Sequence, residues 1–243
     1  MKPLASLSFA AALSAVASIT QAIELNEDFS LYLDAGAYSD YRTRGISQTQ
    51  NDPAVQGSAT LSHASGLYAG VWSSNVDFGL GSDTRQEIDY FAGYNWQISD
   101  DISLDTAYYK YAYPRQGDLN YSEVFSKLSV YGFQLGGYYS DDLGGNQSMF
   151  YSFVGYSHVL PADIGLDLRY GLADYKDPLF IDDQGDTRDS YHEWQVKLSK
   201  ELLGLNWSAS YVDTDLSDSE CLNYMGFDDV CSATLVLGVN KTF

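Results

Sequence analysis

The residues most able to do chemistry in this sequence are charged side chains that recur at alternate positions. Glu87 and Asp89 lie two residues apart in an otherwise apolar segment, and Arg42 and Arg44 repeat the spacing in a polar stretch. Side chains two apart point to the same side of a β-strand, so a curved sheet would gather such groups in the space it encloses. The residues that we expect in this interior are Arg42, Arg44, Asp77, Glu87, Asp89, Asp105, Glu123 and Asp167.

Several of these groups are expected to lie close together. The two arginines follow the first predicted strand and lie near the hairpin that carries Asp77. Charged rings of this kind set the width and electrostatic character of an enclosed passage. A purely structural cluster of salt bridges that holds the loop in place is the alternative. The hypothesis is one ionic network near a rim of the sheet, formed by Arg42, Arg44, Asp77, Glu87, Asp89 and Glu123.

Catalysis by a Ser–His pair is the second chemistry to consider, because membrane lipid hydrolases use it. His63 lies two residues before Ser65, and His158 follows Ser157. Both pairs fall near short turns, and alternation places His192 on an apolar face. We therefore expect three histidines at the edges of an apolar band and no enzyme activity.

An acidic loop and a cysteine pair complete the reactive residues. Residues 182–189 crowd carboxylates around Gly185, as a Ca²⁺ site does, but lack the spacing and distal Glu of a calcium-binding loop. A solvated acidic loop is the favoured reading. Nine residues separate Cys221 from Cys231, and no histidine lies nearby to complete a metal site. A disulfide is the prediction, with free or metal-binding thiols as the alternative. No motif for a phosphate-bearing cofactor is present, and none is expected.

The first residues have the form of an export signal. Lys2 precedes an apolar run from Leu4 to Ile19, and the run ends at Ala22, a small residue suited to cleavage. This predicts a signal peptide over residues 1–22 and a single domain over residues 23–243. An exported protein would meet the oxidising periplasm of a Gram-negative cell, where a disulfide is stable.

Composition excludes several classes of protein. The 243 residues carry a formal net charge of −20, which argues against nucleic-acid binding, because that needs clustered Lys and Arg. A mean hydropathy of −0.23 argues against a helical membrane protein. The 21 tyrosines and 21 glycines suit a sheet with one apolar and one polar face. A soluble β-sandwich shares that composition, so the order of the residues must decide.

The order of the residues alternates with period two in segments of about ten. In residues 164–173, Ile, Leu, Leu, Tyr and Leu occupy one face, while small and charged residues occupy the other. This is the pattern of transmembrane strands. The predicted strands are 30–39, 54–63, 67–77, 86–98, 102–113, 121–131, 133–140, 147–160, 164–175, 188–200, 205–215 and 232–243.

The connections between these strands are sorted by length. Short turns, such as residues 161–163, alternate with longer acidic or Gly-rich loops, such as residues 40–53 and 216–231. Transmembrane barrels have short turns on one rim and long loops on the other, and strands cross a bilayer only as a closed ring. We therefore predict an all-β fold, a transmembrane antiparallel up-and-down β-barrel of about twelve strands.

The last predicted strand ends in an aromatic residue. Apolar residues alternate toward the terminal Phe243, although Lys241 stands where such strands usually have an apolar residue. The pattern resembles the targeting strand that the outer-membrane assembly machinery reads. Phe243 is therefore predicted to be part of an assembly signal.

Six blocks in the mature chain resemble a known family. They read SDYRTRGISQT at 39–49, PAVQG at 53–57, SGLYAGVWSSNVDF at 65–78, EIDYFAGY at 87–94, YAYP at 111–114 and NYSE at 120–123. In this order they are similar to the TorF-type porins of proteobacteria, a family of unknown function. The resemblance implies an outer-membrane barrel with a transport role, and supplies no substrate and no catalytic residue.

Together these features predict a porin-like channel in the cell outer membrane for passive diffusion of small solutes. Excess acid in the interior predicts a preference for cations. The expected surroundings are outer-membrane lipid, lipopolysaccharide and the assembly machinery. A non-conducting structural or ligand-binding barrel is the main alternative, and a membrane lipid hydrolase is a weaker one.

Overall fold

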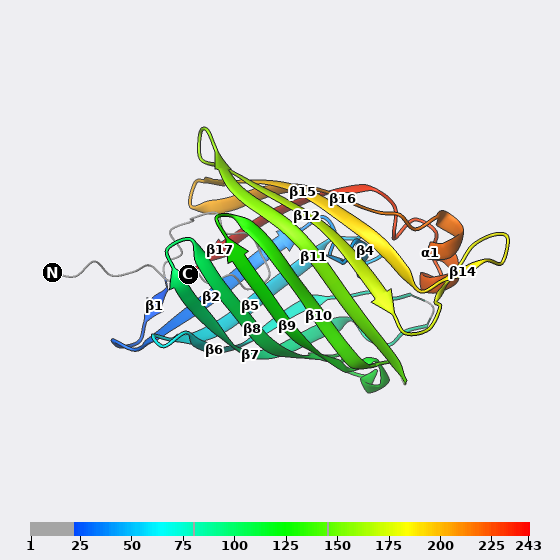
Figure 1. The fold of residues 1–243 in the computed structure, drawn as a ribbon, viewed down its shortest axis with the longest axis horizontal. Coiled ribbons are helices and arrows are strands. Elements are labelled where there is room, and N and C mark those ends of the chain that lie inside the picture. The colour runs from blue at the N-terminus through cyan, green and yellow to red at the C-terminus, as the bar shows by residue number, and fades with distance from the viewer. Residues whose placement is uncertain (1–21, 80, 145) are drawn as a thin grey trace.

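Twelve long antiparallel strands form a closed barrel in the computed structural model, which describes residues 22–79, 81–144 and 146–243 (Figure 1). Each strand pairs with its neighbours along the chain, and β2 closes the ring by pairing with both β5 and β17. The strands are β2 (Phe29–Tyr38), β5 (Ala54–His63), β6 (Leu67–Asn75), β7 (Gln86–Ser99), β8 (Ile102–Ala112), β9 (Tyr121–Val130), β10 (Phe133–Leu143), β11 (Gln147–Leu160), β12 (Ile164–Tyr175), β15 (Ser190–Leu202), β16 (Leu205–Thr214) and β17 (Thr234–Thr242).

The predicted barrel and its twelve strands are confirmed, with ends that differ by a few residues. The largest difference is in β10, which continues three residues beyond the predicted end at 140. The long loops contain elements that alternation did not predict. These are β3 (Arg42–Thr43), β4 (Ile46–Ser47), the 3-10 helix η1 (Gly117–Leu119), β13 (Phe180–Ile181), β14 (Thr187–Arg188) and α1 (Asp218–Met225), while β1 (Ile23–Glu24) precedes β2.

The barrel is apolar outside and polar inside. On β7, Tyr90 and Trp96 are 54% and 53% exposed, whereas Glu87 and Asp89 on the same strand are buried. A protein that folds in water places these residue types the other way round. An exposed apolar face and an enclosed charged face are expected of a barrel that faces lipid.

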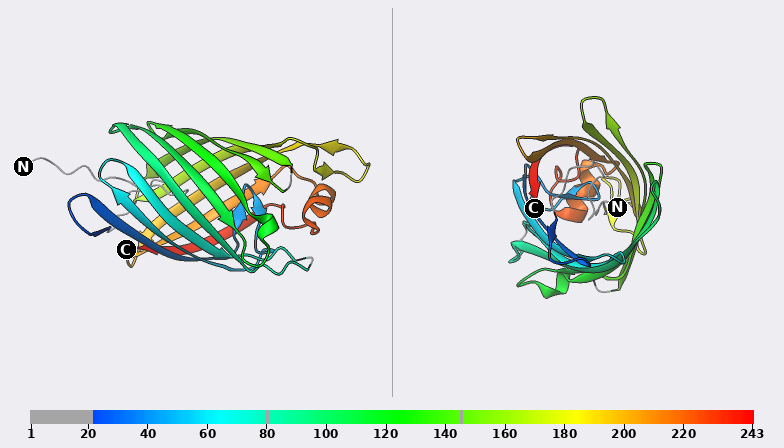
Figure 2. Two further views of the ribbon diagram at one scale, coloured as in Figure 1. Left: turned by 90° about the horizontal axis from the view of Figure 1, so that it is seen from below. Right: turned by 90° about the vertical axis from the view of Figure 1, so that its left-hand side faces the viewer.

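The two ends of the barrel differ as the loop lengths predicted. Tight turns lie at the end that holds β1 and the C-terminus, and the long loops with α1 and β14 lie at the other (Figures 1 and 2). Tyr131-Gly132 and Leu203-Gly204 both have positive φ, which is the backbone of a two-residue hairpin turn. Within the described residues, no helix is long and apolar enough to cross a membrane.

The long-loop end has a hydrophobic core of its own. Ile46 of β4 packs there with Phe180 of β13, with Tyr191 of β15 and with Cys221 of α1. Cys221 is bonded to Cys231, so the predicted disulfide is confirmed. The long loops on this side therefore form a packed layer over the barrel.

Candidate functional site

The loop after β2 folds back into the barrel as a small hairpin, β3–β4, seen in blue inside the ring in the end-on view of Figure 2. Asp40 holds its base, because its carboxylate accepts from Arg42 Nε at 2.6 Å, from Ser47 Oγ at 2.6 Å and from Thr49 Oγ1 at 3.0 Å. At the tip, Gly45 has a φ of 86°, and a Cβ there would lie 2.4 Å from a Thr214 methyl group. The tip therefore requires glycine.

Arg44 extends from this hairpin tip to the opposite wall. Its Nη2 lies 2.6 Å from Glu123 Oε1, and the Glu123 side chain is fully buried. The guanidinium lies over the rings of Tyr138 and Tyr151, at 5.3 and 5.0 Å from their centroids. The hydroxyl of Tyr191 donates to the Arg44 carbonyl at 2.9 Å. Four side chains from β9, β10, β11 and β15 thus fix Arg44 as one charged bridge across the interior.

A second ion pair lies on the wall formed by β12 and β15. Arg169 Nε donates to Glu193 Oε1 at 2.8 Å, and Arg169 Nη2 donates to Gln195 at 3.1 Å. The Tyr151 hydroxyl also donates to Glu193. Tyr151 therefore contacts Arg44 and the carboxylate that pairs with Arg169, and so connects the two ion pairs.

Two carboxylates lie next to each other on β7. Glu87 accepts from the Tyr41 hydroxyl at 3.2 Å, and Tyr41 belongs to the same loop as the hairpin. Asp89 Oδ1 is buried and accepts no hydrogen bond from the described residues. This part of the wall is acidic.

Below the hairpin, toward the short-turn end, lies a cavity of about 360 Å³. Aromatic side chains from β6 to β11 line one side of it, and polar side chains of β12, β15 and β16 line the other. The charged residues that line it are Asp40, Arg42, Arg44, Asp89, Lys127, Asp167, Arg169 and Lys197.

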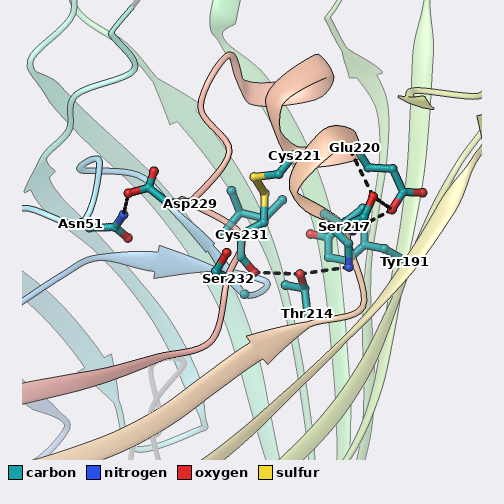
Figure 3. Close-up of a disulfide and its surroundings, with 12 residues drawn as sticks. Asn51, Tyr191, Thr214, Ser217, Glu220, Cys221, Asp229, Cys231 and Ser232 are labelled. Atoms are coloured by element: carbon teal, nitrogen blue, oxygen red, sulfur yellow. Dashed lines mark hydrogen bonds between the residues drawn. A yellow bond between two sulfur atoms is a disulfide. The ribbon is translucent and has the colours of Figure 1, made fainter. Parts of the chain in front are cut away.

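The segment closed by the disulfide braces the hairpin from above (Figure 3). The Ser47 amide donates to the Val230 carbonyl at 2.9 Å, and Arg42 Nη1 donates to the Ser232 carbonyl at 2.8 Å. Thr214 Oγ1 donates to the Cys231 carbonyl at 2.9 Å. The disulfide thus ties α1 to the same short stretch of backbone that holds the hairpin.

Helix α1 is fixed at its start by a capping box. The Glu220 amide donates to Ser217 Oγ, and Glu220 Oε2 accepts from the Ser217 amide. Arg188 of β14 also pairs with Glu220. Burial acts to raise the pKa of Glu220, but the hydrogen bonds from Arg188 and Ser217 outweigh it and lower that pKa. The carboxylate is therefore held in its charged form.

A family comparison identifies the group to which this sequence belongs. A model of bacterial proteins of unknown function, Gcw_chp, matches residues 24–243. The chain belongs to the Gcw_chp family. No protein with a curated description matches the sequence.

Solved porins share the fold of this Gcw_chp chain. A structure of the KdgM porin matches with a TM-score of 0.50 and 9% identity, over 87% of this chain and 99% of the other. A structure of the NanC porin matches with a TM-score of 0.51 and 11% identity, over 87% and 98%. At such low identity the likeness establishes the architecture alone.

The single ionic network expected in the Gcw_chp chain is divided into separate groups. Arg44 does pair with Glu123, but Arg42 pairs with Asp40. Asp77 lies 3.7 Å from Arg85 in an exposed pair. Asp77 therefore lies outside the group around Arg44, because Asp40 neutralises Arg42 locally and Gln50 is the loop residue that reaches Asp77.

The two remaining predicted carboxylates lie nearer the short-turn ends of their strands. Asp105 accepts from the Tyr68 hydroxyl at 2.8 Å, and Asp167 accepts from Ser157 Oγ at 2.6 Å. They are separate from the Arg44 bridge. Arg169 and Glu193 were absent from the predicted set, although alternation placed Arg169 on the polar face of its strand.

The histidines and the acidic loop make local contacts. His63 Nδ1 accepts from the Ser65 amide at 3.1 Å within one turn, and His192 contacts Asp215 at 3.1 Å. Asp182 accepts from the amides of Gln184 and Asp186 and thereby closes the β13–β14 turn. Among the residues that the structure describes, no group of three or more His, Cys, Asp or Glu has a metal-binding arrangement.

Proposed function

We propose that this protein is a porin-like channel of the outer membrane that lets small solutes diffuse through a constricted lumen. The observation that carries the proposal is the pairing of an apolar outer face with a charged internal cavity in a closed ring of twelve strands. Barrels of eight strands are filled by side chains, and those of sixteen leave a wide channel. A ring of twelve, narrowed by a hairpin, suits small solutes.

The proposed location includes export by residues 1–22, which lie outside the described residues apart from Ala22. Assembly would use the last strand. The Phe243 amide and carbonyl both pair with Leu33, at 2.8 and 3.2 Å, so the terminal residue takes part in closing the ring. This supports a role for Phe243 in recognition by the assembly machinery. Lipid and lipopolysaccharide are the proposed neighbours of the apolar face.

The TorF-type resemblance agrees with this proposal. Two of the blocks that carry the resemblance lie in the interior. Residues 39–49 contain the hairpin, and residues 87–94 carry Glu87 and Asp89. Their position supports the proposed channel. We propose that these blocks form the constriction. The transport role implied by the resemblance is part of the same proposal.

The preference for cations, predicted from the excess of acid, lacks support from the cavity. Five cationic and three acidic residues line it. The acid excess of the sequence lies largely in the exposed loops, such as residues 182–189. The reversal potential in a salt gradient is the direct measure of charge selectivity.

A non-conducting barrel is the second candidate, and one observation favours it. The core around Ile46, Phe180 and Cys221 packs the long-loop end. A barrel sealed there would present a ligand-binding cavity to one side only. It would remain an outer-membrane protein with the same fold.

A planar bilayer recording separates the two candidates. Protein of residues 23–243, refolded in detergent, is added to a bilayer in potassium chloride, with detergent alone as the control. The channel proposal predicts discrete conductance steps that appear only with folded protein. Silent bilayers, obtained with protein whose heat-modifiable mobility shows a folded barrel, would reject the channel and favour the second candidate.

A further inference from the structure

The two walls of the cavity differ in chemistry. Six aromatic side chains form a continuous surface on one side, and cationic and amide side chains face them. A passage for water and simple ions needs polar walls only, so the aromatic side is unexplained by diffusion alone. These six, one from each strand from β6 to β11, are Trp72, Phe91, Tyr109, Phe125, Tyr138 and Phe153; Tyr38, Tyr41, Tyr111 and Tyr151 also line the cavity.

Inward-facing glycines keep this aromatic surface flat. A Cβ on Gly70 would lie 2.5 Å from Phe91 Cζ, and a Cβ on Gly136 would lie 2.6 Å from Phe153 Cζ. Each ring therefore lies over a glycine of the neighbouring strand, against the wall. Because the rings lie flat, the interior stays open instead of filling with side chains.

Contacts between the rings make the surface continuous. Phe125 and Tyr138 lie 4.6 Å apart between centroids, and Phe125 contacts the edge of Tyr109 at 6.2 Å. Tyr138 and Phe153 are only partly buried, although they point into the barrel. Ring surface is thus available to a solute in the cavity, and stacking on it stabilises another ring.

Cationic side chains line the cavity on both sides. Lys127 and Gln134 lie on β9 and β10 beside the aromatic side chains, whereas Arg169, Gln195 and Lys197 lie on the facing strands β12 and β15. Positive groups that also have amide neighbours hold a carboxylate through charge-assisted hydrogen bonds.

Two acids beside these cations are engaged to different degrees. Glu193 is fully buried behind Arg169, outside the cavity lining, and also accepts from Tyr151. Asp167 accepts from Ser157, which in turn accepts from Gln134, but Asp167 lines the cavity and its buried Oδ2 accepts no hydrogen bond from the described residues. Arg169 therefore faces the cavity with its carboxylate partner behind it, and the cations that line the cavity outnumber the acids.

We infer that the cavity is a binding site for a small carboxylate that carries a ring, with the ring on the aromatic side chains and the carboxylate on the cationic side chains Lys127, Arg169 and Lys197. The inference rests on the proposed function for the route by which the solute enters. The cavity volume of about 360 Å³ falls within the range of small-molecule sites, which are concave, largely apolar and supplied with few polar groups.

Isothermal titration calorimetry on barrels in lipid nanodiscs tests the site without requiring conductance. The probes are benzoate, acetate, which lacks the ring, and benzyl alcohol, which lacks the charge, with empty nanodiscs as the blank. We expect benzoate to bind about tenfold or more tightly than acetate or benzyl alcohol. Only benzoate can both stack on the aromatic side chains and pair with the cationic ones.

Three variants locate the site. Lys127→Gln and Phe153→Leu should each weaken benzoate binding about threefold to tenfold. Lys200→Gln removes the same charge as Lys127→Gln, on the strand that carries Lys197 but outside the cavity lining, and should leave binding unchanged. Circular dichroism confirms that each barrel is folded.

Each outcome decides a separate question. Equal binding of benzoate and acetate, or an equal loss in Lys200→Gln, would overturn the site. If the protein conducts in bilayers but binds benzoate no more tightly than acetate, the channel proposal stays intact and the site is refuted. Preferential benzoate binding by a barrel that never conducts would retain the site and refute the channel.

Discussion

Arg44 is the residue on which the interior depends most. It is the one cation that crosses from the hairpin to Glu123, and both side chains are nearly or fully buried. Two charges in such surroundings stabilise a fold only as a pair, because each alone carries an uncompensated desolvation cost. The exposed pair of Arg85 and Asp77 has no such dependence.

Replacement of Arg44 therefore has a predictable cost. Arg44→Gln should lower the free energy of unfolding by about 3–5 kcal/mol, since it leaves Glu123 buried without its partner. Arg85→Gln makes the same chemical change in an exposed pair and should cost about 0–1 kcal/mol. Urea titrations in lipid vesicles measure both. Equal costs would mean that the Arg44 bridge is not formed.

Gly136 offers a second test at the residue scale. A methyl group at this position meets the Phe153 ring, so Gly136→Ala should turn that ring into the cavity. Overpacking should cost roughly 1–3 kcal/mol and should lower single-channel conductance. Gly57→Ala is the matched control, because a Cβ there makes only an ordinary contact at 3.4 Å. The same effect in both variants would contradict the flat-ring arrangement.

At the scale of elements, the disulfide and the hairpin act as one unit. The Cys221–Cys231 bond closes the segment whose Val230 carbonyl accepts from the Ser47 amide. A double Cys→Ser variant should lose about 2–4 kcal/mol of local stability. Hydrogen exchange at the Ser47 amide should accelerate accordingly, while exchange at Lys127 in β9 stays unchanged. An unaltered Ser47 rate would show that the hairpin is held without the disulfide.

The attachment of α1 should depend on pH. Because hydrogen bonds lower the pKa of Glu220 in the folded protein, its contribution is fully present above the ordinary carboxyl pKa near 4.5. It is lost as the pH falls below that value, toward the lower pKa of the folded state. Hydrogen exchange in residues 218–225 should therefore accelerate in that acidic range. Glu220→Gln should show the faster exchange already at pH 7 and little further change on acidification.

The elements differ in how well the sequence predicts them. Alternation located all twelve strands, because each residue's face in a barrel is set by its immediate neighbours. The hairpin escaped prediction because distant residues hold it, whereas α1 was overlooked although Ser217 and Glu220 form a local capping-box signal. Arg44 pairs with a residue 79 positions away, and Arg42 bonds a carbonyl 190 positions away. Asp40 was overlooked for the same reason, since its role appears only once the loop has folded inward.

At the scale of the whole molecule, the distribution of charge matters more than the net charge. The chain carries −20, yet the cavity has more cationic than acidic lining residues. Acidic residues in the long loops repel anions from a distance, while the cavity attracts them at short range. Salt screens the exposed loops more than the enclosed cavity. The affinity of the cavity for a ring-bearing carboxylate at high ionic strength should therefore be higher than a model based on surface charge alone predicts.

The closed ring itself is tested by two neighbouring positions on β16 and β17. Leu237 is 54% exposed on the outer face, and Ser208 lines the cavity and pairs with Gly238, the residue after Leu237. Leu237→Arg should lower the free energy of unfolding in lipid by about 2–4 kcal/mol, because it places a charge in hydrocarbon. Ser208→Arg places the same charge at the same height in the wet interior and should cost far less. If urea titrations in vesicles gave the two variants equal costs, the outer face would not contact lipid and the inner face would not contact water as assigned.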